Sequence, residues 1–299
     1  MTHRRAVALM VLVTLMWSIA GVVTRHLDAA RAFEVTFWRS AFNALALVLL
    51  LLWWRGPWQL AHALKRGGRT LWMSGVCWSV MFTAFMVALT LTTVANVLIT
   101  MAISPFLTAL VARIALGHRL PARTWAAIVV AGLGIAWMYG AEVAGDPRHL
   151  GGVLVALCVP VAAALNWTVI QHNASARAQD MLPAVLIGAV LSAALALPLA
   201  LPLSASAHDV GLLAILGVVQ LAIPCLIAVT LAQVLSAPEI SLLALLEVVF
   251  GVAWAWIGAG ETPSASVLGG GALVLAALVA NEAGALGAAR PAQGAGAAG

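Results

Sequence analysis

The sequence predicts an all-α membrane protein with ten transmembrane helices, arranged as two inverted five-helix repeats. Three observations support this prediction: the composition, the recurrence of apolar segments along the chain, and sequence matches between its two halves. Of the 299 residues, 64% are apolar and only 8% are charged, whereas soluble domains carry about 25% charged residues. A chain with so few charges cannot cover a globular surface with polar groups, which places it in a lipid bilayer.

Apolar segments of bilayer length follow one another with short connections. The ten predicted spans are residues 6–24, 33–54, 71–91, 94–115, 123–141, 150–171, 182–202, 210–233, 239–258 and 264–282. Glycine and proline, which end helices, occupy the connections, as at Gly56-Pro57, Gly67-Gly68 and Pro263. Lipid offers no partners to the backbone, so segments this long and apolar satisfy their own hydrogen bonds only as helices. The strands of a barrel would be half as long and would alternate in polarity.

The first span resembles a signal peptide. However, residues 6–24 form an uninterrupted run of 19 uncharged residues, which is longer than the apolar region of an ordinary signal peptide. Further spans follow it directly. We therefore expect a retained first helix rather than a segment that is removed.

The positions of the basic residues predict the orientation. With a cytoplasmic amino terminus and ten spans, eleven Lys and Arg residues fall on the cytoplasmic side and three on the opposite side. The eleven are Arg4, Arg5, Arg55, Lys65, Arg66, Arg69, Arg113, Arg119, Arg123, Arg177 and Arg290, and the three are Arg25, Arg31 and Arg148. This bias places both termini in the cytoplasm. It also explains the net charge of +5 as topology, with anionic lipid headgroups and not nucleic acid as the partner.

Several function classes lack their motifs in this sequence. Cys77, Cys158 and Cys225 all fall inside apolar spans, and three separated cysteines form neither a disulfide framework nor a metal site. The sequence contains no HExxH, GxSxG or Walker A motif and no Cys/His cluster with metal-ligand spacing. We therefore expect no metal, no cofactor and no enzymatic activity.

Two sets of matches indicate an internal repeat. Residues 15–19 in span one match residues 165–169 in span six, and residues 95–120 in span four align with residues 238–263 in span nine, so that Ser104 corresponds to Glu247. Because five is an odd number, a duplicated five-helix unit enters the membrane from the opposite side, as in secondary transporters with a substrate site near the midplane. We therefore divide the chain into a first repeat (1–141), a second, inverted repeat (142–283) and a disordered cytoplasmic tail (284–299) that is rich in Ala and Gly.

Glu247 is an ionisable residue in the interior of span nine. It follows Glu239 by eight residues, or about 12 Å of helix in a hydrocarbon core of about 30 Å. A charge at this depth costs roughly 3 kcal/mol and usually faces a water-filled cavity or a polar partner. We hypothesise that Glu247 binds and releases a proton during transport. The alternatives are a protonated Glu that joins two helices by a hydrogen bond, or a span whose limits are shifted.

Arg39 lies six residues inside Phe33, at about 9 Å from the outer edge of span two. With Thr36 and Asn43 it forms a polar stripe on one side of the helix. Arg39 would attract an anionic group such as a substrate carboxylate, or it would extend outward or pair with Glu34. Since the depths of Arg39 and Glu247 differ by about 9 Å, we do not expect a direct contact between them.

Further polar and aromatic residues inside the spans fit either a substrate pathway or ordinary packing. Span four carries Asn96, Thr100, Ser104 and Thr108 at four-residue intervals. Pro224 in span eight frees the backbone carbonyl of Gln220. The interior tryptophans are Trp17, Trp78 and Trp167, whereas Trp53, Trp54 and Trp58 indicate an interfacial belt. The small-residue ridges Gly132, Ala136 and Gly140, and Ala272, Ala276 and Ala280, indicate scaffold contacts or a dimer seam.

The chain resembles the drug/metabolite transporter superfamily, and within it the EamA-type ten-helix exporters. The resemblance rests on Trp17-Ser18, on Trp38-Arg39, and on the two turns Gly117-His118 and Gly260-Glu261, each of which precedes another helix. It covers about residues 6–283. Members often carry Glu-Pro in both span four and span nine, whereas one copy here keeps Pro105 and the other Glu247, and His118 replaces the usual Glu.

The resemblance implies that helices one, three, four, six, eight and nine surround the transport pathway. It nominates Trp17, Trp78, Asn96, Ser104, Asn166, Trp167, Gln220 and Glu247 as pathway residues, with Arg39 at the rim. The predicted function is export of a small organic metabolite, such as an amino acid or a drug-like amine, across a bacterial inner membrane by alternating access. A homodimer is compatible with the small-residue ridges.

Two other classes of function remain as alternatives. An intramembrane enzyme that modifies lipid would need a nucleophile or an acid–base pair at depth, and Glu247 has no His near it in the sequence. In a structural or sensory membrane protein, the polar residues of spans one, four, six, eight and nine would scatter over lipid-facing and buried sides. The packing of the helices distinguishes these cases.

Overall fold

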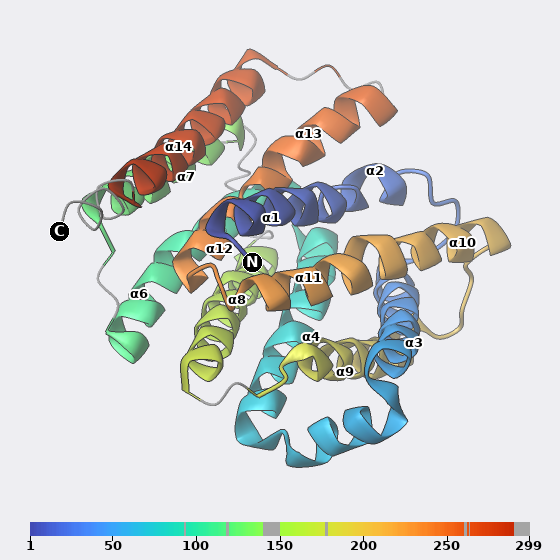
Figure 1. Ribbon diagram of the computed structural model, residues 1–299. Helices are drawn as coiled ribbons and strands as arrows, with labels where there is room; N and C mark the ends of the chain where they lie inside the picture. The colour runs from blue at the N-terminus through green and yellow to red at the C-terminus, as the bar shows by residue number, and fades with distance from the viewer. Residues whose placement is uncertain are drawn as a thin grey trace.

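The regular structure of the chain is helical throughout its described part, which confirms the predicted all-α class. The computed structural model describes residues 1–92, 94–117, 120–139, 150–176, 179–259, 262 and 264–289. The elements, labelled in Figure 1, are α1 (His3–Trp17), α2 (Ala20–Thr24), α3 (Ala32–Arg66), α4 (Gly68–Leu91), α5 (Val94–Met101), α6 (Ser104–Leu116), α7 (Ala122–Tyr139), α8 (Leu150–Ala176), α9 (Leu182–Ala200), α10 (Ala207–Ile215), η3 (Leu216–Ala222), α11 (Ile223–Leu231), α12 (Ala237–Ala244), α13 (Leu246–Ala259) and α14 (Ala265–Ala289). Seven of the described segments are long and apolar enough to cross a membrane, and three shorter apolar helices accompany them. Helix α14 ends at Ala289, beyond the predicted boundary at residue 283, so the first part of the predicted tail is helical, and residues 290–299 lie outside the described ranges.

Four of the predicted spans are not single regular helices. Span one is interrupted at Ser18, span four at Ala102 and span nine at Leu245. At Leu245 the backbone N–H donates to the carbonyl of Leu242, three residues back, at 3.1 Å, which is the tighter 3₁₀ geometry. The predicted span 210–233 contains the π-helical segment η3. This segment lies directly before Pro224, whose missing N–H disturbs the regular ladder, and a π-helical turn absorbs that disturbance.

Helix α3 is longer than the predicted span 33–54 because it consists of two arms. Gly56 has φ 76° and ψ 161°, and Pro57 follows it. Glycine adopts a positive φ without steric cost, and proline cannot donate to the preceding turn, so the helix changes direction here. In Figure 1 the second arm runs across the bottom of the molecule before the chain rises into α4. We call this second arm, residues 57–66, the elbow helix.

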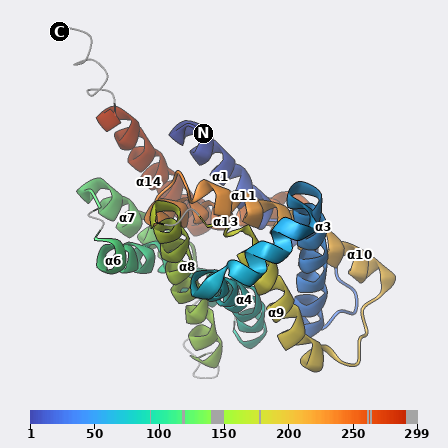
Figure 2. The ribbon, with the colours of Figure 1, turned by 60° about the horizontal axis from the view of Figure 1, so that its bottom comes forward.

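Helices from the two predicted halves alternate in space. Helix α4 packs against α8 and α9, α3 packs against α9 and η3, α1 packs against α11, and α6 packs against α8 and α12. Helices α7 and α14 lie side by side at the edge of the bundle (Figures 1 and 2). Each of these contacts joins an element before residue 141 to one after residue 142, so neither half forms a separate body.

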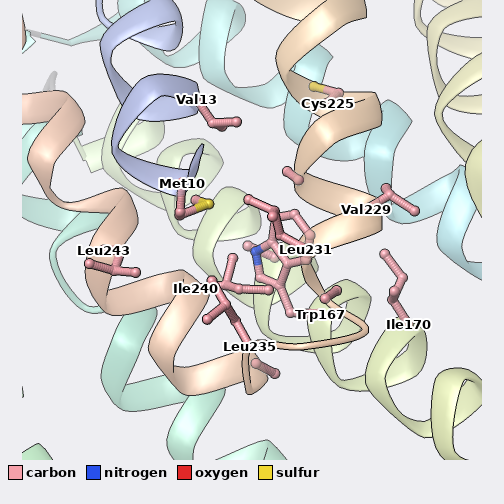
Figure 3. Packing of buried hydrophobic residues seen from close by; sticks show 14 of the residues in the cluster. Met10, Val13, Trp167, Ile170, Cys225, Val229, Leu231, Leu235, Ile240 and Leu243 are labelled. Atoms are coloured by element: carbon pink, nitrogen blue, oxygen red, sulfur yellow. The ribbon is translucent and has the colours of Figure 1, made fainter. Parts of the chain in front are cut away.

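The main apolar core extends over most helices of the bundle, and one part of it lies where α1, α8, α11 and α12 meet. Figure 3 shows Met10 and Val13 of α1 facing Trp167 of α8 and Ile240 of α12. All four side chains are buried. Because lipid is as apolar as these side chains, their contacts stabilise the bundle through close packing more than through removal from water.

The seam between α7 and α14 depends on two glycines. A Cβ atom at Gly270 would lie 2.4 Å from the carbonyl oxygen of Gly134, and one at Gly134 would lie 2.8 Å from the carbonyl oxygen of Gly270. The predicted ridges lie two positions away from these glycines and do not form the seam. Ala136, Ala272, Ala276 and Ala280 are exposed, and Gly140 lies outside the described residues.

On the face opposite the amino terminus, two carboxylates join the loop after α2 to the loop after α9. Asp209 accepts hydrogen bonds from the backbone N–H groups of residues 28, 29 and 30 at 2.8, 2.9 and 3.0 Å. Reciprocally, Glu34 accepts from the backbone N–H groups of Ser204 and Ala205 at 2.8 and 2.7 Å and from the Ser204 hydroxyl at 2.8 Å. Arg31 adds hydrogen bonds to the carbonyls of residues 200 and 202. We call this arrangement the reciprocal clasp.

Candidate functional site

A cavity of about 150 Å³ lies inside the helix bundle. Seven of the nine predicted pathway residues line it: Trp17, Arg39, Trp78, Ser104, Trp167, Gln220 and Glu247. They come from α1, α3, α4, α6, α8, η3 and α13. Residues far apart in the sequence therefore converge on one space, and most of the remaining wall is apolar.

Aromatic side chains form one wall of the cavity. The rings of Trp78 and Trp167 meet edge to face, with centroids 5.5 Å apart and an interplanar angle of 85°. Phe82, one helical turn after Trp78, lies 5.4 Å from it. Edge-to-face pairs are a favoured aromatic geometry, and they hold large flat surfaces in fixed positions. The wall can therefore bind the apolar part of a solute without rearrangement.

Arg39 is buried in the cavity wall instead of lying at an exposed rim. Its side chain is 2% exposed, and one guanidinium nitrogen donates to the carbonyl of Phe82 at 3.1 Å. The Nε of Arg39 has no hydrogen-bond partner. A buried guanidinium with donors to spare is an attractive site for a carboxylate or another anion.

Glu247 lies in the first turn of α13, directly after the interruption at Leu245. It lines the same cavity as Arg39, but no ion pair at contact distance joins these two described residues. The cavity thus presents a cation and a carboxyl group that are separated in space. A solute with both an anionic and a cationic group would complement them.

Gln220 and Trp78 leave further hydrogen-bonding groups unused. The amide nitrogen of Gln220 donates to the carbonyl of Trp17 at 3.2 Å, whereas its Oε1 has no partner. The indole N–H of Trp78 also has none. Buried polar groups are normally paired, and unpaired ones are typical of sites that receive a ligand or water.

The sequence did not single out Ser241 as a pathway residue. Its hydroxyl lines the cavity, lies 3.0 Å from the Ser104 hydroxyl and accepts a hydrogen bond from Thr108 at 3.1 Å. An isolated serine in an apolar span has the same pattern as an ordinary packing residue. The position of Thr108 four residues after Ser104 marks a polar side of span four that could pack on Ser241, but this sequence signal is weak.

One of the predicted pathway residues, Asn166, does not line the cavity, and the side chain of another, Asn96, is not described. Asn166 is fully buried and accepts a hydrogen bond from Ser74 of α4 at 2.6 Å. It directly precedes Trp167, and consecutive helical residues point about 100° apart, so only one of the pair faces the cavity. Asn96 lies in α5, and its side chain is outside the described residues.

The interrupted spans four and nine have closely matching helix boundaries when residue numbers are shifted by 143, and the start of the second helix differs by one residue (Ser104 of α6, Leu246 of α13). Helix α5 covers Val94–Met101 and α12 covers Ala237–Ala244. Helix α6 ends at Leu116 and α13 ends at Ala259. The interruptions at Ala102 and Leu245 also correspond. Only the first copy has a proline after the interruption, so the break does not depend on proline alone.

One group of potential metal ligands occurs away from the cavity, in the reciprocal clasp. Ligand atoms of Asp28, His208 and Asp209 lie within 4.8 Å of one another. Both carboxylate oxygens of Asp209 already accept backbone hydrogen bonds, and His208 lies 3.2 Å from the exposed Asp28. We therefore assign this group to the clasp and not to a metal.

Comparisons with known proteins agree on the type of protein. The EamA-like transporter family matches residues 4–140. Two proteins of Pseudomonas aeruginosa, from strains UCBPP-PA14 and PAO1, are each named pseudopaline exporter CntI. Each is 26% identical over 282 residues, which are 93% of this chain and 95% of the relative. A solved crystal structure has a TM-score of 0.77 at 17% identity, with 93% of this chain and 98% of that chain covered, and it shows the shared fold.

Proposed function

We propose that this chain, which belongs to the EamA-like transporter family, is a secondary transporter that exports a small organic metabolite by alternating access. The observation that carries the proposal is that Arg39, Glu247 and the aromatic wall line the same cavity. In a structural or sensory protein the polar residues of these spans would scatter. A lipid-modifying enzyme would need a nucleophile or an acid–base pair. Hydroxyl groups such as that of Ser104 line the cavity, but the described lining residues include no histidine that would activate them.

The chemistry of the cavity favours a substrate of the amino-acid type, with Arg39 binding the carboxylate and Glu247 facing the amine. The volume of about 150 Å³ is below the roughly 300–1,000 Å³ of pockets for drug-sized ligands. This favours a compact metabolite over a large drug-like amine. The name of the relatives, pseudopaline exporter, supports export as the direction.

Two observations support the arrangement of two inverted halves, residues 1–141 and 142–283. The first is the agreement of the helix boundaries in spans four and nine. The second is the pattern of neighbours: α4 packs on α8 as α11 packs on α1, and α4 packs on α9 as η3 packs on α3. In each pair of contacts, a helix of the first half that packs on a helix of the second is matched by the equivalent helices with the two halves interchanged. This is the arrangement that alternating access by inverted repeats requires.

The membrane placement of the proposal is a bacterial inner membrane with both termini in the cytoplasm. It rests on the excess of Lys and Arg on one side of the bilayer. We retain a homodimer as part of the proposal, because exposed small residues on α7 and α14 would let a second copy approach closely.

Proton coupling through Glu247 is the mechanistic part of the proposal, and Glu247→Gln tests it. Glutamine keeps the shape of the side chain but cannot release a proton, so transport should lose its pH dependence. Loss of a charged partner for an ammonium group costs about 1.5–3 kcal/mol, and we expect at least about tenfold slower amino-acid transport at subsaturating substrate. The measurement is uptake of labelled amino acids into inverted vesicles with and without a proton gradient.

The matched control is Glu239→Gln, which removes a carboxylate from the same span outside the cavity. Glu239 lies within 2.6 Å of His3 and caps α12, so its loss should leave the pH profile unchanged once the amount of protein in the vesicles is equalised. If Glu247→Gln transports with the pH dependence of the wild type, proton coupling through this residue is wrong. If wild-type vesicles transport no amino acid, the proposed substrate class is wrong.

A further inference from the structure

The elbow helix carries a basic stripe that faces a groove outside the transport cavity. Gln59, His62 and Arg66 follow one another at spacings of three and four residues, which places them on one side of the elbow helix. Arg55 also lines the groove, but it precedes the non-helical Gly56 and belongs to the first arm of α3. The groove has a volume of about 570 Å³, and the loop between α8 and α9 closes it with Gln179 and Asp180. In Figure 2 the elbow helix crosses in front of the bundle, between α3 and α4.

Of the basic side chains that line the groove, Arg55 forms an ion pair, whereas His62 and Arg66 form none with another described residue. Arg55 pairs with Asp180, the acidic residue that lines the groove, at 3.3 Å. Within the described part of the chain, no hydrogen bond or ion pair engages His62 or Arg66. Gln59 and Gln179 add amide donors. The groove therefore offers hydrogen-bond donors and uncompensated positive charge to an anion.

Three exposed tryptophans lie at the junction between the first arm of α3 and the elbow helix. Trp53 is 86% exposed, Trp54 62% and Trp58 85%, and Trp58 also lines the groove. Indole rings concentrate at the level of lipid headgroups, where one end is apolar and the other is hydrated. Leu60 on the other side of the elbow helix is buried against the core. The elbow helix is thus anchored at one depth, with its basic stripe beside the tryptophans.

We propose that the groove between the elbow helix and the α8–α9 loop binds the headgroup of an anionic glycerophospholipid. The phosphate would lie between Arg66 and His62, and the amides of Gln59 and Gln179 would donate to its oxygens. The exposed tryptophans would contact the glycerol backbone and the upper part of the acyl chains. The tryptophans favour an anionic lipid over a soluble anion. Both ligands would complement the basic groups, but only a lipid would also contact the exposed tryptophans, which are typical of the headgroup level of a membrane.

The position of the groove gives the bound lipid a structural consequence. The elbow helix connects the first arm of α3, which carries Arg39, to α4, which carries Trp78. Both residues line the transport cavity. A lipid seated against the elbow helix would fix the ends of these two helices relative to the α8–α9 loop. The proposal does not depend on the identity of the transported solute.

The test compares two charge-removing variants of adjacent residues in the full-length protein. Arg66→Gln removes a basic group that lines the groove, and Lys65→Gln removes an exposed basic group next to it that does not. Native mass spectrometry of the purified protein, titrated with phosphatidylglycerol or phosphatidylcholine, measures lipid affinity. A basic side chain near the membrane surface contributes about 1 kcal/mol, so Arg66→Gln should weaken phosphatidylglycerol binding about fivefold. Lys65→Gln should change it less than twofold.

Three results would overturn the proposal. Equal losses in the two variants would indicate diffuse attraction without a built site. Equal affinity of the wild type for phosphatidylglycerol and phosphatidylcholine would exclude recognition of anionic lipid. Displacement of the lipid by millimolar inorganic phosphate would assign the groove to a soluble anion. His62→Gln provides a second variant with the same expected direction, and thermal unfolding curves show that each variant is folded.

Discussion

At the scale of single residues, Arg39 and Glu247 are the basic and the acidic side chain among the described residues that line the cavity. Each lines the same space, and neither neutralises the other by direct contact. Breaking a buried charge pair usually costs several kcal/mol because one charge remains uncompensated. A cavity that keeps its two charges apart avoids this cost when a zwitterionic solute enters, since both charges then gain a partner at the same time.

Replacement of Arg39 tests its role toward a carboxylate. In Arg39→Gln the substrate carboxylate loses a charged donor, which corresponds to about 1.5–3 kcal/mol, so we expect the KM for an amino acid to rise about tenfold or more. Arg39→Lys keeps the charge but loses the planar fork and should be intermediate. The measurement is the concentration dependence of transport into vesicles.

The control for Arg39 is a change in the substrate instead of the protein. The amine that corresponds to the same amino acid without its carboxyl group should be transported equally by the wild type and by Arg39→Gln. If the variant slows both compounds to the same extent, Arg39 supports the fold of the cavity and does not bind the carboxylate.

A polar side chain inside an apolar span predicted a cavity residue well, whereas being next to a cavity residue in the sequence did not. Glu247, Arg39 and Gln220 were predicted because polar groups at depth are expensive, and all three line the cavity. Asn166 was predicted together with Trp167, but it bonds to Ser74. Sequence could not separate this pair, because α8 is apolar on nearly all sides and its pattern does not indicate which face is inside.

At the scale of helices, the stability of the α7–α14 contact depends on the absence of a Cβ atom at two glycines. Gly134→Ala and Gly270→Ala each place a Cβ within 2.8 Å of a carbonyl oxygen across the seam. Overpacking of this kind costs about 1–3 kcal/mol, so both variants should unfold at lower temperature in detergent than the wild type. Gly132→Ala is the matched control, because a Cβ there meets no atom within 4 Å.

This comparison separates two interpretations of the small residues. If Gly132→Ala is as destabilising as Gly134→Ala in thermal unfolding, the seam runs along the ridge predicted from sequence. If it leaves the unfolding temperature unchanged but alters the oligomeric state on size-exclusion chromatography, the ridge contacts a second copy. The spacing of small residues predicts that a close contact exists, but two ridges separated by two positions face different directions, and only packing decides between them.

The helix limits show which local features a sequence can predict. The elbow follows from Gly56-Pro57, a pair that ends or bends helices by its own geometry. The interruptions at Ala102 and Leu245 have no such pair in both copies. They were not predicted, because a shift from α-helical to 3₁₀ hydrogen bonds costs little and leaves the apolar pattern intact.

At the scale of the whole molecule, the composition and the apolar spans predicted the helical membrane class, and the structure confirms it. The way the helices surround one cavity could not be derived from composition. It depends on contacts between helices that are far apart in the chain, such as α1 with α11 and α6 with α12. The two internal matches, residues 15–19 with 165–169 and residues 95–120 with 238–263, were the sequence signals that pointed to this arrangement. The second match aligns Ser104 with Glu247, and both residues line the cavity.

The reciprocal clasp constrains how such a molecule can open. Asp209 holds the loop of residues 28–30, and Glu34 holds residues 204 and 205. Each loop is thus fastened by a side chain from the first turn of the helix that follows the other loop. Any opening on this face must either release both fastenings together or carry the two loops along as one lid. A disulfide engineered between the two loops distinguishes these cases when transport is measured with and without a reductant. If the loops move together, the disulfide leaves transport unchanged. If the loops separate during transport, the disulfide blocks it.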